Sequence, residues 1–177
     1  MMTDTLPGLE APAPPSTGGQ WRIDSLQVVN WGGFQGHVQV PLNSASTLIS
    51  GPSGSGKSTL LDAYIALMMP DTTPFNGASN DATMGRARNS EQRNLLSYLR
   101  GKTDIAREVT GELTDRVIRP GTTWGAVGGT FTNDSQQVVT AFRVYYVPAS
   151  ATRDSEIRRR FCLADGQFDL SDLDRLR

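Results

Sequence analysis

Three features of this 177-residue sequence predict an α/β fold. A short apolar run at residues 47–50 leads into the glycine-rich segment GPSGSGKS, residues 51–58, and an apolar helical pattern follows at residues 57–69. Segments with strand-like alternation lie on both sides of this unit. The glycine-rich segment fits the pattern G-x-x-x-x-G-K-[ST] in full. The predicted class is therefore a P-loop NTPase, with a mixed sheet around the P-loop helix and additional β-hairpins.

Composition limits the function classes. Hydrophobic residues make up 37% of the chain and charged residues 20%, which describes a globular protein with one core. The formal net charge of −1 excludes a global attraction to nucleic acid, so any such contact must come from a local patch. No membrane span or signal peptide is apparent, and the single cysteine, Cys162, suits a reducing compartment. We therefore expect a cytoplasmic protein without a membrane partner.

The N-terminal half divides into a tail and a strand–helix unit. Residues 1–20 are rich in proline, glycine and small polar residues and should form a disordered tail, so the ordered domain is expected at 21–177. Strands are expected at 21–29, 36–42 and 47–50. The lone His37 alternates with apolar neighbours and should face solvent on its strand. On the following helix an apolar stripe is expected to pack on a sheet. It comprises Leu60, Leu61, Tyr64, Ile65 and Met68.

The C-terminal half is predicted to be mainly β. The polar segment 70–90 should be a functional or mobile loop, with a short helix at 91–99, and residues 101–120 give an ambiguous pattern. Two hairpins are expected, at 124–147 and at 157–170, the second with Asp165-Gly166 as its turn. Ser171 and Asp174 have the spacing of a helix start.

The phosphate loop carries the clearest chemistry. Its glycines let successive backbone N–H groups point at phosphates, and the helix N-terminus adds partial positive charge. Lys57 should reach the β- and γ-phosphates, Ser58 should ligate Mg²⁺, and Thr59 can reach the α-phosphate. The expected nucleotide-binding residues of this loop are Gly51, Pro52, Ser53, Gly54, Ser55, Gly56, Lys57, Ser58 and Thr59.

A hydrolytic P-loop enzyme also needs an acidic residue that holds Mg²⁺ at the end of a second strand. The one candidate is Asp165, after the apolar run 161–164, although Asp165-Gly166 is also a hairpin signal. One alternative is thus a self-sufficient small NTPase or kinase with Asp165 as its metal acid. A second alternative is a scaffold in which the phosphate loop is purely structural. A GTPase is disfavoured because the chain has no D-x-x-G motif.

The ordered chain resembles the opening of the SMC-type chromosome-organising ATPases, including the Rad50 relatives. The resemblance rests on NWGGF at 30–34, a second strand, and GPSGSGKSTLLDAY at 51–64. It is nearer to the MukB/MksB branch and the JetC subunit of Wadjet plasmid-defence systems, through RNLLSYLRGK at 93–102 and SEIRRRFCLADGQFDL at 155–170. The family implies that residues 21–177 form the N-terminal lobe of an ATPase head, with the end leading towards a coiled coil.

The resemblance also implies ligands and partners. Asn30 and Trp31 match a turn that often lies near adenine and ribose, and Arg86, Arg88 or Arg93 matches an arginine near the phosphates. ATP and Mg²⁺ would bind, with hydrolysis only in the dimeric assembly and little turnover by this chain alone. Expected partners are the head's own C-terminal lobe with Walker B and signature motifs, a second head, kleisin-type and accessory subunits, and double-stranded DNA. Chromosome condensation, loop extrusion or plasmid defence at the nucleoid would follow.

Two arginine groups are candidates for contact with DNA phosphates. They are Arg86, Arg88, Arg93 and Arg100, and the triplet Arg158, Arg159 and Arg160. Three successive arginines on a strand point to both faces, so at least one must be paired or lie along apolar surface. The alternative is an arginine-guarded sheet edge without a DNA role.

Overall fold

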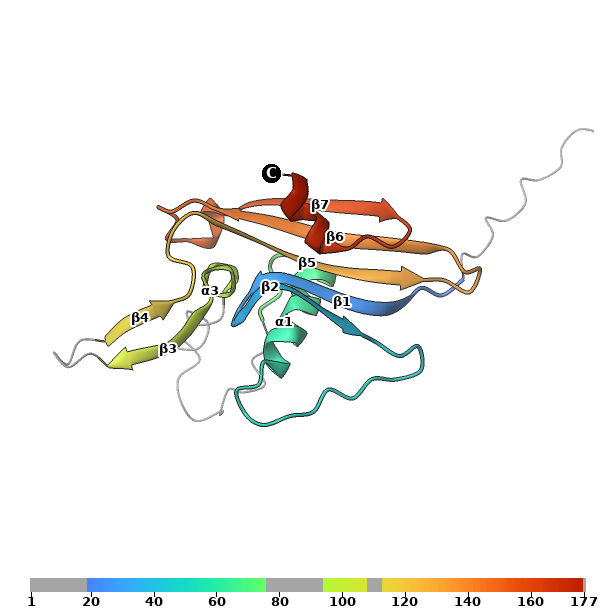
Figure 1. The fold of residues 1–177 in the computed structure, drawn as a ribbon, viewed down its shortest axis with the longest axis horizontal. Coiled ribbons are helices and arrows are strands. Elements are labelled where there is room, and N and C mark those ends of the chain that lie inside the picture. Colours follow the sequence, from blue (N-terminus) through green and yellow to red (C-terminus); the bar gives the residue numbers. More distant parts are fainter. Residues whose placement is uncertain (1–18, 76–93, 108–112, 177) are drawn as a thin grey trace, which may run out of the picture.

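The computed structural model describes residues 19–75, 94–107 and 113–176, and Figure 1 shows their arrangement. Five strands form an antiparallel sheet in the order β2-β1-β5-β6-β7. Its strands are β1 (Arg22–Trp31), β2 (Phe34–Pro41), β5 (Thr123–Thr132), β6 (Val138–Val147) and β7 (Arg158–Asp165). A separate two-stranded sheet contains β3 (Lys102–Arg107) and β4 (Leu113–Val117), so the described part of the ambiguous region 101–120 is mainly β.

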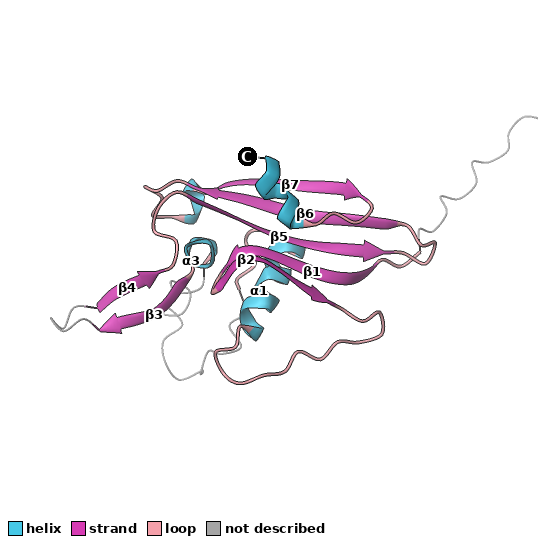
Figure 2. Ribbon diagram, in the orientation of Figure 1, coloured by secondary structure: helices cyan, strands magenta, loops and turns pink. Residues whose placement is uncertain are grey.

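Helices and 3₁₀ turns cover the two faces of the large sheet. The helices α1 (Lys57–Met68) and α3 (Leu95–Arg100) lie on one face, and the 3₁₀ segment η2 (Leu170–Leu176) lies on the other (Figures 1 and 2). A short 3₁₀ turn, η1 (Asp154–Glu156), precedes β7. The larger core lies between α1, α3 and the sheet and includes Trp31, Leu67 and Leu99. A smaller cluster around Phe142 and Leu170 lies under η2.

Several elements agree with the sequence predictions. The P-loop helix and the hairpin of β5 and β6 are confirmed, and the fold is of the predicted α/β class. The first two strands form an antiparallel pair around the turn at residues 31–34. The predicted helix at 91–99 appears as α3, which begins after the capping residue Asn94. Residues 1–18 of the predicted tail and 76–93 of the predicted polar loop lie outside the described residues.

The predicted strand at 47–50 is wrong, and the sheet is antiparallel rather than mixed. Residues 46–50 have no regular structure, and no described strand pairs with them. The side chains of Leu48 and Ile49 are 89% and 43% exposed. An apolar run of this length forms a buried strand only where a sheet is available to pair with it, and the described sheet does not extend to this segment.

The predicted face of α1 is only partly correct, because Leu60 packs against the core but most of the predicted stripe does not. The side buried against the sheet comprises Asp62, Ala63, Ala66 and Leu67. From the predicted stripe, Leu61, Tyr64 and Met68 are exposed. The helix therefore has two apolar sides, and periodicity alone cannot determine which one packs on the sheet.

The predicted second hairpin does not form. The chain turns at Gly166, but residues 167–176 cross the opposite face of the sheet instead of pairing with β7. Phe168 stacks on Phe142 with a centroid distance of 5.2 Å, and the Leu170 backbone N–H donates to Gln27 Oε1 at 2.9 Å. This crossing partly buries His37, which contacts Gln27 rather than facing solvent as predicted. The helix start expected at Ser171 becomes the 3₁₀ segment η2.

Arg100 joins three separated stretches of backbone. Its guanidinium donates to the carbonyls of Arg119, Pro120 and Gly121 and to those of Pro148 and Ala149. The residue is 7% exposed. Arg100 is thus a structural residue of the corner beside α3, and the prediction of a DNA contact at this position is wrong.

Candidate nucleotide-binding site

The phosphate loop lies directly before α1 and is open to solvent. Residues 51–55 are exposed, and Gly54 and Gly56 have left-handed backbone conformations with φ of 80° and 91°. α1 begins after Gly56 without a side-chain cap and with no acidic residue in its first turn. The N-cap residue therefore offers no side-chain acceptor to the first N–H groups, which is the arrangement that binds phosphate at a helix N-terminus.

Lys57 folds back over this loop. Its Nζ donates to the carbonyl oxygens of Gly51 and Pro52, both at 2.7 Å. The ammonium group is thus on the concave side of the loop, where phosphate oxygens could replace these carbonyl acceptors. Ser58 follows in the first turn of α1, as the pattern for Mg²⁺ ligation requires. Among the described residues no cluster of three or more His, Cys, Asp or Glu side chains could hold a metal by itself.

The structure tests the expectation that Trp31 and Asn30 contact the base. Trp31 is fully buried, and its indole Nε1 donates to the Thr59 carbonyl at 2.9 Å, so the ring cannot stack on an adenine. The Asn30 amide donates to the Trp124 carbonyl at 3.2 Å and its Oδ1 accepts from the Gly36 N–H at 3.0 Å. Asn30 is thereby committed to the turn between β1 and β2. The expectation of direct base contacts is wrong for Trp31 and unsupported for Asn30.

Two residues near the site were missed by sequence reasoning. Tyr98 of α3 stacks on Trp31 with a centroid distance of 4.8 Å and an interplanar angle of 8°. Its hydroxyl donates to the carboxylate of Asp62, which is fully buried on α1. Asp62 belongs to the STLLDA run that follows the phosphate loop, but nothing in its spacing indicates a tyrosine partner from a segment 36 residues further along the chain.

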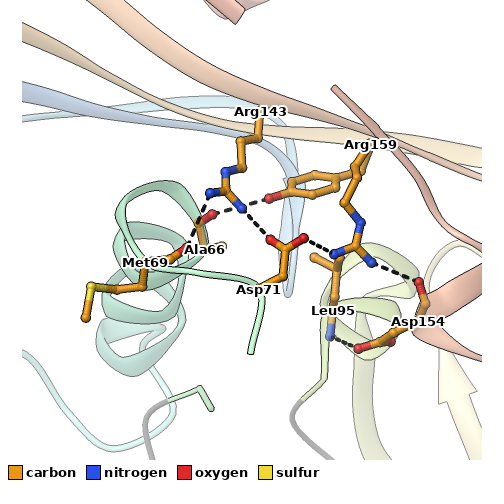
Figure 3. Close-up of polar contacts among 8 residues, drawn as sticks. Ala66, Met69, Asp71, Leu95, Arg143, Asp154 and Arg159 are labelled. Atoms are coloured by element: carbon orange, nitrogen blue, oxygen red, sulfur yellow. Dashed lines mark hydrogen bonds and ion pairs between the residues drawn. The ribbon is translucent and has the colours of Figure 1, made fainter. Parts of the chain in front are cut away.

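The C-terminal end of α1 is fixed by charge, as Figure 3 shows. Asp71 accepts from Arg143 of β6 at 2.5 Å and from Arg159 of β7 at 2.6 Å. Burial alone would raise the pKa of Asp71, but its hydrogen bonds and charge interactions with Arg159 and then Arg143 hold this pKa below the ordinary value. The network continues because Arg159 also donates to the Asp154 carbonyl at 3.1 Å. The Asp154 carboxylate in turn accepts from two N–H groups at the start of α3.

This network corrects the prediction for the arginine triplet. The expectation that at least one member is paired is confirmed, because Arg159 is bound to Asp71 and is not available for DNA. Arg158 and Arg160 alternate with it and point to the other face, where both are exposed. The Arg158 guanidinium lies 5.8 Å from the centroid of the Tyr146 ring. Arg86, Arg88 and Arg93 lie outside the described residues.

Asp165 is far from the phosphate loop. Through the paired positions of β6 and β5, Asp165 is level with Ile23 near the start of β1. Trp31, which contacts Thr59, is the last residue of β1. The eight positions between Ile23 and Trp31 correspond to about 26 Å of strand. The prediction that Asp165 is the Mg²⁺ acid is therefore wrong, because a metal ligand must lie within about 2–3 Å of the ion.

Comparisons with known proteins agree with this geometry. Residues 23–82 match the family model described as the P-loop containing region of AAA domain. The chain is also 29% identical over 109 residues to the chromosome partition protein MukB of Haemophilus ducreyi, a match that covers 61% of this chain and 7% of that protein. The chain thus spans only a small part of its relative's length. Among the described residues, no helix is long and apolar enough to cross a membrane. Together, the matched P-loop region and the MukB similarity support the resemblance of this chain to the SMC-like P-loop ATPases.

Proposed function

We propose that this chain binds ATP·Mg²⁺ as one lobe of an SMC-like ATPase head. The observation that carries the proposal is the complete phosphate-loop pattern at the uncapped start of α1, with Lys57 folded over the loop. Gly51 to Thr59 would hold the phosphates, and Ser58 would contribute a ligand to Mg²⁺. When bound, the metal would neutralise charge on the β- and γ-phosphates.

The same geometry argues that this lobe needs other components for hydrolysis. Asp165 lies at the far end of the sheet from the phosphate loop, so the metal acid would come from elsewhere in the assembly. We assign the Walker B acid to a C-terminal lobe of the same head and the signature motif to a second head. Engagement of two heads around ATP would then complete the site.

Exposed apolar side chains support a further lobe against α1. Leu48 and Ile49 precede the phosphate loop, and Leu61, Tyr64 and Met68 lie on the exposed side of α1. Exposed apolar side chains on a helix and in the segment that leads to it are surface that a second sheet can bury. We propose that a C-terminal lobe pairs with residues 46–50 and packs on this face.

The MukB relative is a chromosome partition protein, and we carry that role to this chain as part of the proposal. ATP-dependent engagement and release of heads would drive DNA organisation, including loop extrusion, or plasmid defence, with kleisin-type subunits as partners. Arg158 and Arg160 are the described candidates for contact with the DNA backbone. Replacing both with glutamate should weaken binding to double-stranded DNA and flatten its salt dependence, as expected for phosphate contacts. Unchanged DNA binding would mean that Arg158 and Arg160 only protect the edge of the sheet from pairing and have no DNA role.

The first experiment measures Mg·ATP binding and steady-state hydrolysis on the 177-residue chain, with Lys57→Ala and Asp165→Ala beside it. Binding that Lys57→Ala abolishes, with negligible turnover and no effect of Asp165→Ala, supports the proposed lobe. Binding that is absent or independent of Lys57 would favour a structural phosphate loop. Robust turnover by the isolated chain would contradict the need for a second lobe.

A further inference from the structure

We infer that the turn between β1 and β2, residues 31–34, positions the phosphate loop, and that Trp31 is its main positioning residue. The inference rests on the proposed nucleotide binding and adds the part of the protein that holds the binding loop in shape. In this inference, residues 31–34 position the first turn of α1 through packing and a hydrogen bond, and do not contact the nucleotide base. Three sets of contacts carry it.

The first turn of α1 is not stabilised by its own sequence. Gly56 occupies the N-cap position without a side-chain hydrogen bond, and the first turn contains no acidic residue. A serine or aspartate cap would stabilise the helix, but its oxygen would bind the same N–H groups that a phosphate requires. A helix start that must remain open to an anion therefore benefits from support outside its N–H groups.

Trp31 provides support of that kind. Its indole Nε1 donates to the carbonyl of Thr59, which lies in the first turn of α1 directly after Ser58. A carbonyl oxygen has two lone pairs, so it accepts this bond as well as its bond within the helix. The contact holds the turn through an acceptor and does not use its N–H donors.

The Trp31 side chain is in turn held in place by Tyr98 of α3. Its ring stacks on Tyr98, whose hydroxyl donates to Asp62 one turn further along α1. The Tyr98 carbonyl accepts from the N–H of Gly32 at 2.8 Å, which ties α3 to the same turn. The β1–β2 turn, α3 and the start of α1 are thus connected by buried hydrogen bonds around one aromatic stack.

Two close approaches fix the turn against the loop. A Cβ atom at Gly32 would lie 2.5 Å from the methyl group of Thr59, and one at Gly56 would lie 2.8 Å from Cζ of Phe34. Both glycines also have positive φ, of 55° and 91°. The turn therefore contacts the loop at a distance that only glycine at both positions permits, so a shift of the turn would move the loop as well.

The test separates phosphate positioning from base contact. Binding of Mg·ATP and of Mg·tripolyphosphate, which has the phosphate chain without base or ribose, is measured by calorimetry on the wild-type chain and Trp31→Phe. Phenylalanine retains an aromatic ring but lacks the N–H donor. We expect Trp31→Phe to weaken both ligands by the same factor, about three- to tenfold, the range for loss of one buried hydrogen bond.

Tyr145→Phe is the matched control. Tyr145 is 2% exposed and its hydroxyl lies 3.5 Å from the Ala66 carbonyl, so this variant removes a buried polar contact at the other end of α1. Burial raises the pKa of Tyr145 to about 12, so its hydroxyl is neutral at the pH of the assay. This variant should leave both affinities unchanged. Equal weakening by the two variants would indicate general loosening of α1 and would overturn the inference.

The remaining outcomes are distinct. A loss of affinity confined to Mg·ATP would mean that Trp31 acts on the base or ribose, and would overturn the inference. Unchanged affinities for both ligands, with Lys57→Ala still abolishing binding, would leave the proposed function intact but refute the positioning role of Trp31. Binding that is absent or independent of Lys57 would overturn the proposed function and this inference with it. If Trp31→Phe does not fold by circular dichroism, Phe34→Leu tests the contact at Gly56, with the same equal loss expected for both ligands.

Discussion

At its first turn α1 is held by one neutral indole hydrogen bond and by close packing at glycines, whereas beyond its last turn it is held by charge. The first contact joins Trp31 to Thr59. The second joins Asp71 to Arg143 and Arg159, with an additional bond from Arg143 to the Met69 carbonyl at 3.3 Å. The same helix is thus anchored by a neutral hydrogen bond and close packing at its start, and by ion pairs after its end.

The difference follows from what each end must do. The N-terminal end has to accept a polyanion, so a fixed carboxylate there would repel the ligand and a capping oxygen would compete with it. The C-terminal end has no such role, and arginine near it interacts favourably with the helix dipole. Neutral support at one end and ion pairs at the other are therefore compatible with binding and with stability.

The largest expected effect is on the N-terminal anchor. Trp31→Ala should lower the free energy of unfolding by about 3–5 kcal/mol, because it removes a fully buried aromatic side chain and its hydrogen bond. Urea denaturation followed by circular dichroism measures the change. Trp21→Ala, at a tryptophan that is 44% exposed, is the control and should cost much less. Equal losses of unfolding free energy in Trp31→Ala and Trp21→Ala would show that Trp31 is not a special anchor of α1.

Gly56→Ala should have an intermediate effect. Its positive φ disfavours alanine, and the added Cβ would meet the Phe34 ring, so we expect about 1–2 kcal/mol of destabilisation together with weaker Mg·ATP binding. Gly121→Ala is the matched control, because a Cβ at Gly121 would meet no atom within 4 Å and its φ is not positive. Full affinity in Gly56→Ala would show that the loop does not need its present shape.

At the C-terminal anchor, Asp71→Asn should cost about 0.5–1 kcal/mol at pH 7, because water screens a carboxylate that is about half exposed. The folded-state pKa of Asp71 lies below its ordinary value of 3.8. Its contribution is therefore complete above that ordinary value and is lost as the pH falls through the lower folded-state value. Melting temperatures of wild type and Asp71→Asn should converge on acidification below about pH 4. A gap that widens in acid would contradict the ion-pair assignment.

The smallest effect is expected on the exposed side of α1. Leu61→Ser should change the stability of this chain by less than about 0.5 kcal/mol, since the side chain is already 47% exposed. Leu67→Ala, on the buried side, should cost about 2–5 kcal/mol in the same urea titration. A large loss from Leu61→Ser would mean that this face is covered within the chain and would weaken the proposal of a second lobe.

Local signals predicted those parts of the fold that depend on local sequence. The phosphate-loop pattern, the P-loop helix and the β5–β6 hairpin all have their determinants within a few residues of one another, and all three are present. The strand at 47–50 failed because a strand needs a partner, which no local pattern reveals. The hairpin at Asp165-Gly166 failed because Phe168 and Leu170 pack on the other face of the sheet, a long-range contact.

The site followed the same rule. The candidate loop residues follow from spacing alone, because they belong to one continuous segment; their contacts with a nucleotide remain a prediction. The support of the loop was not, since Trp31, Tyr98 and Asp62 come from three elements that only the tertiary fold brings together. Strand alternation predicted that at least one arginine of the triplet is paired, but it did not indicate that this is Arg159 or that its partner is Asp71, 88 residues away.

The corner built around Arg100 has a consequence for the order of acid unfolding. Its acceptors are all backbone carbonyls, which take up no protons over the range in which Asp71 becomes neutral. Acidification therefore removes the tie between α1 and the strands β6 and β7 before it affects the tie between α3 and residues 119–121 and 148–149. Mild acid should therefore loosen the residues that follow α1 while this corner is retained, and amide exchange should rise first near Met69 rather than at Lys57.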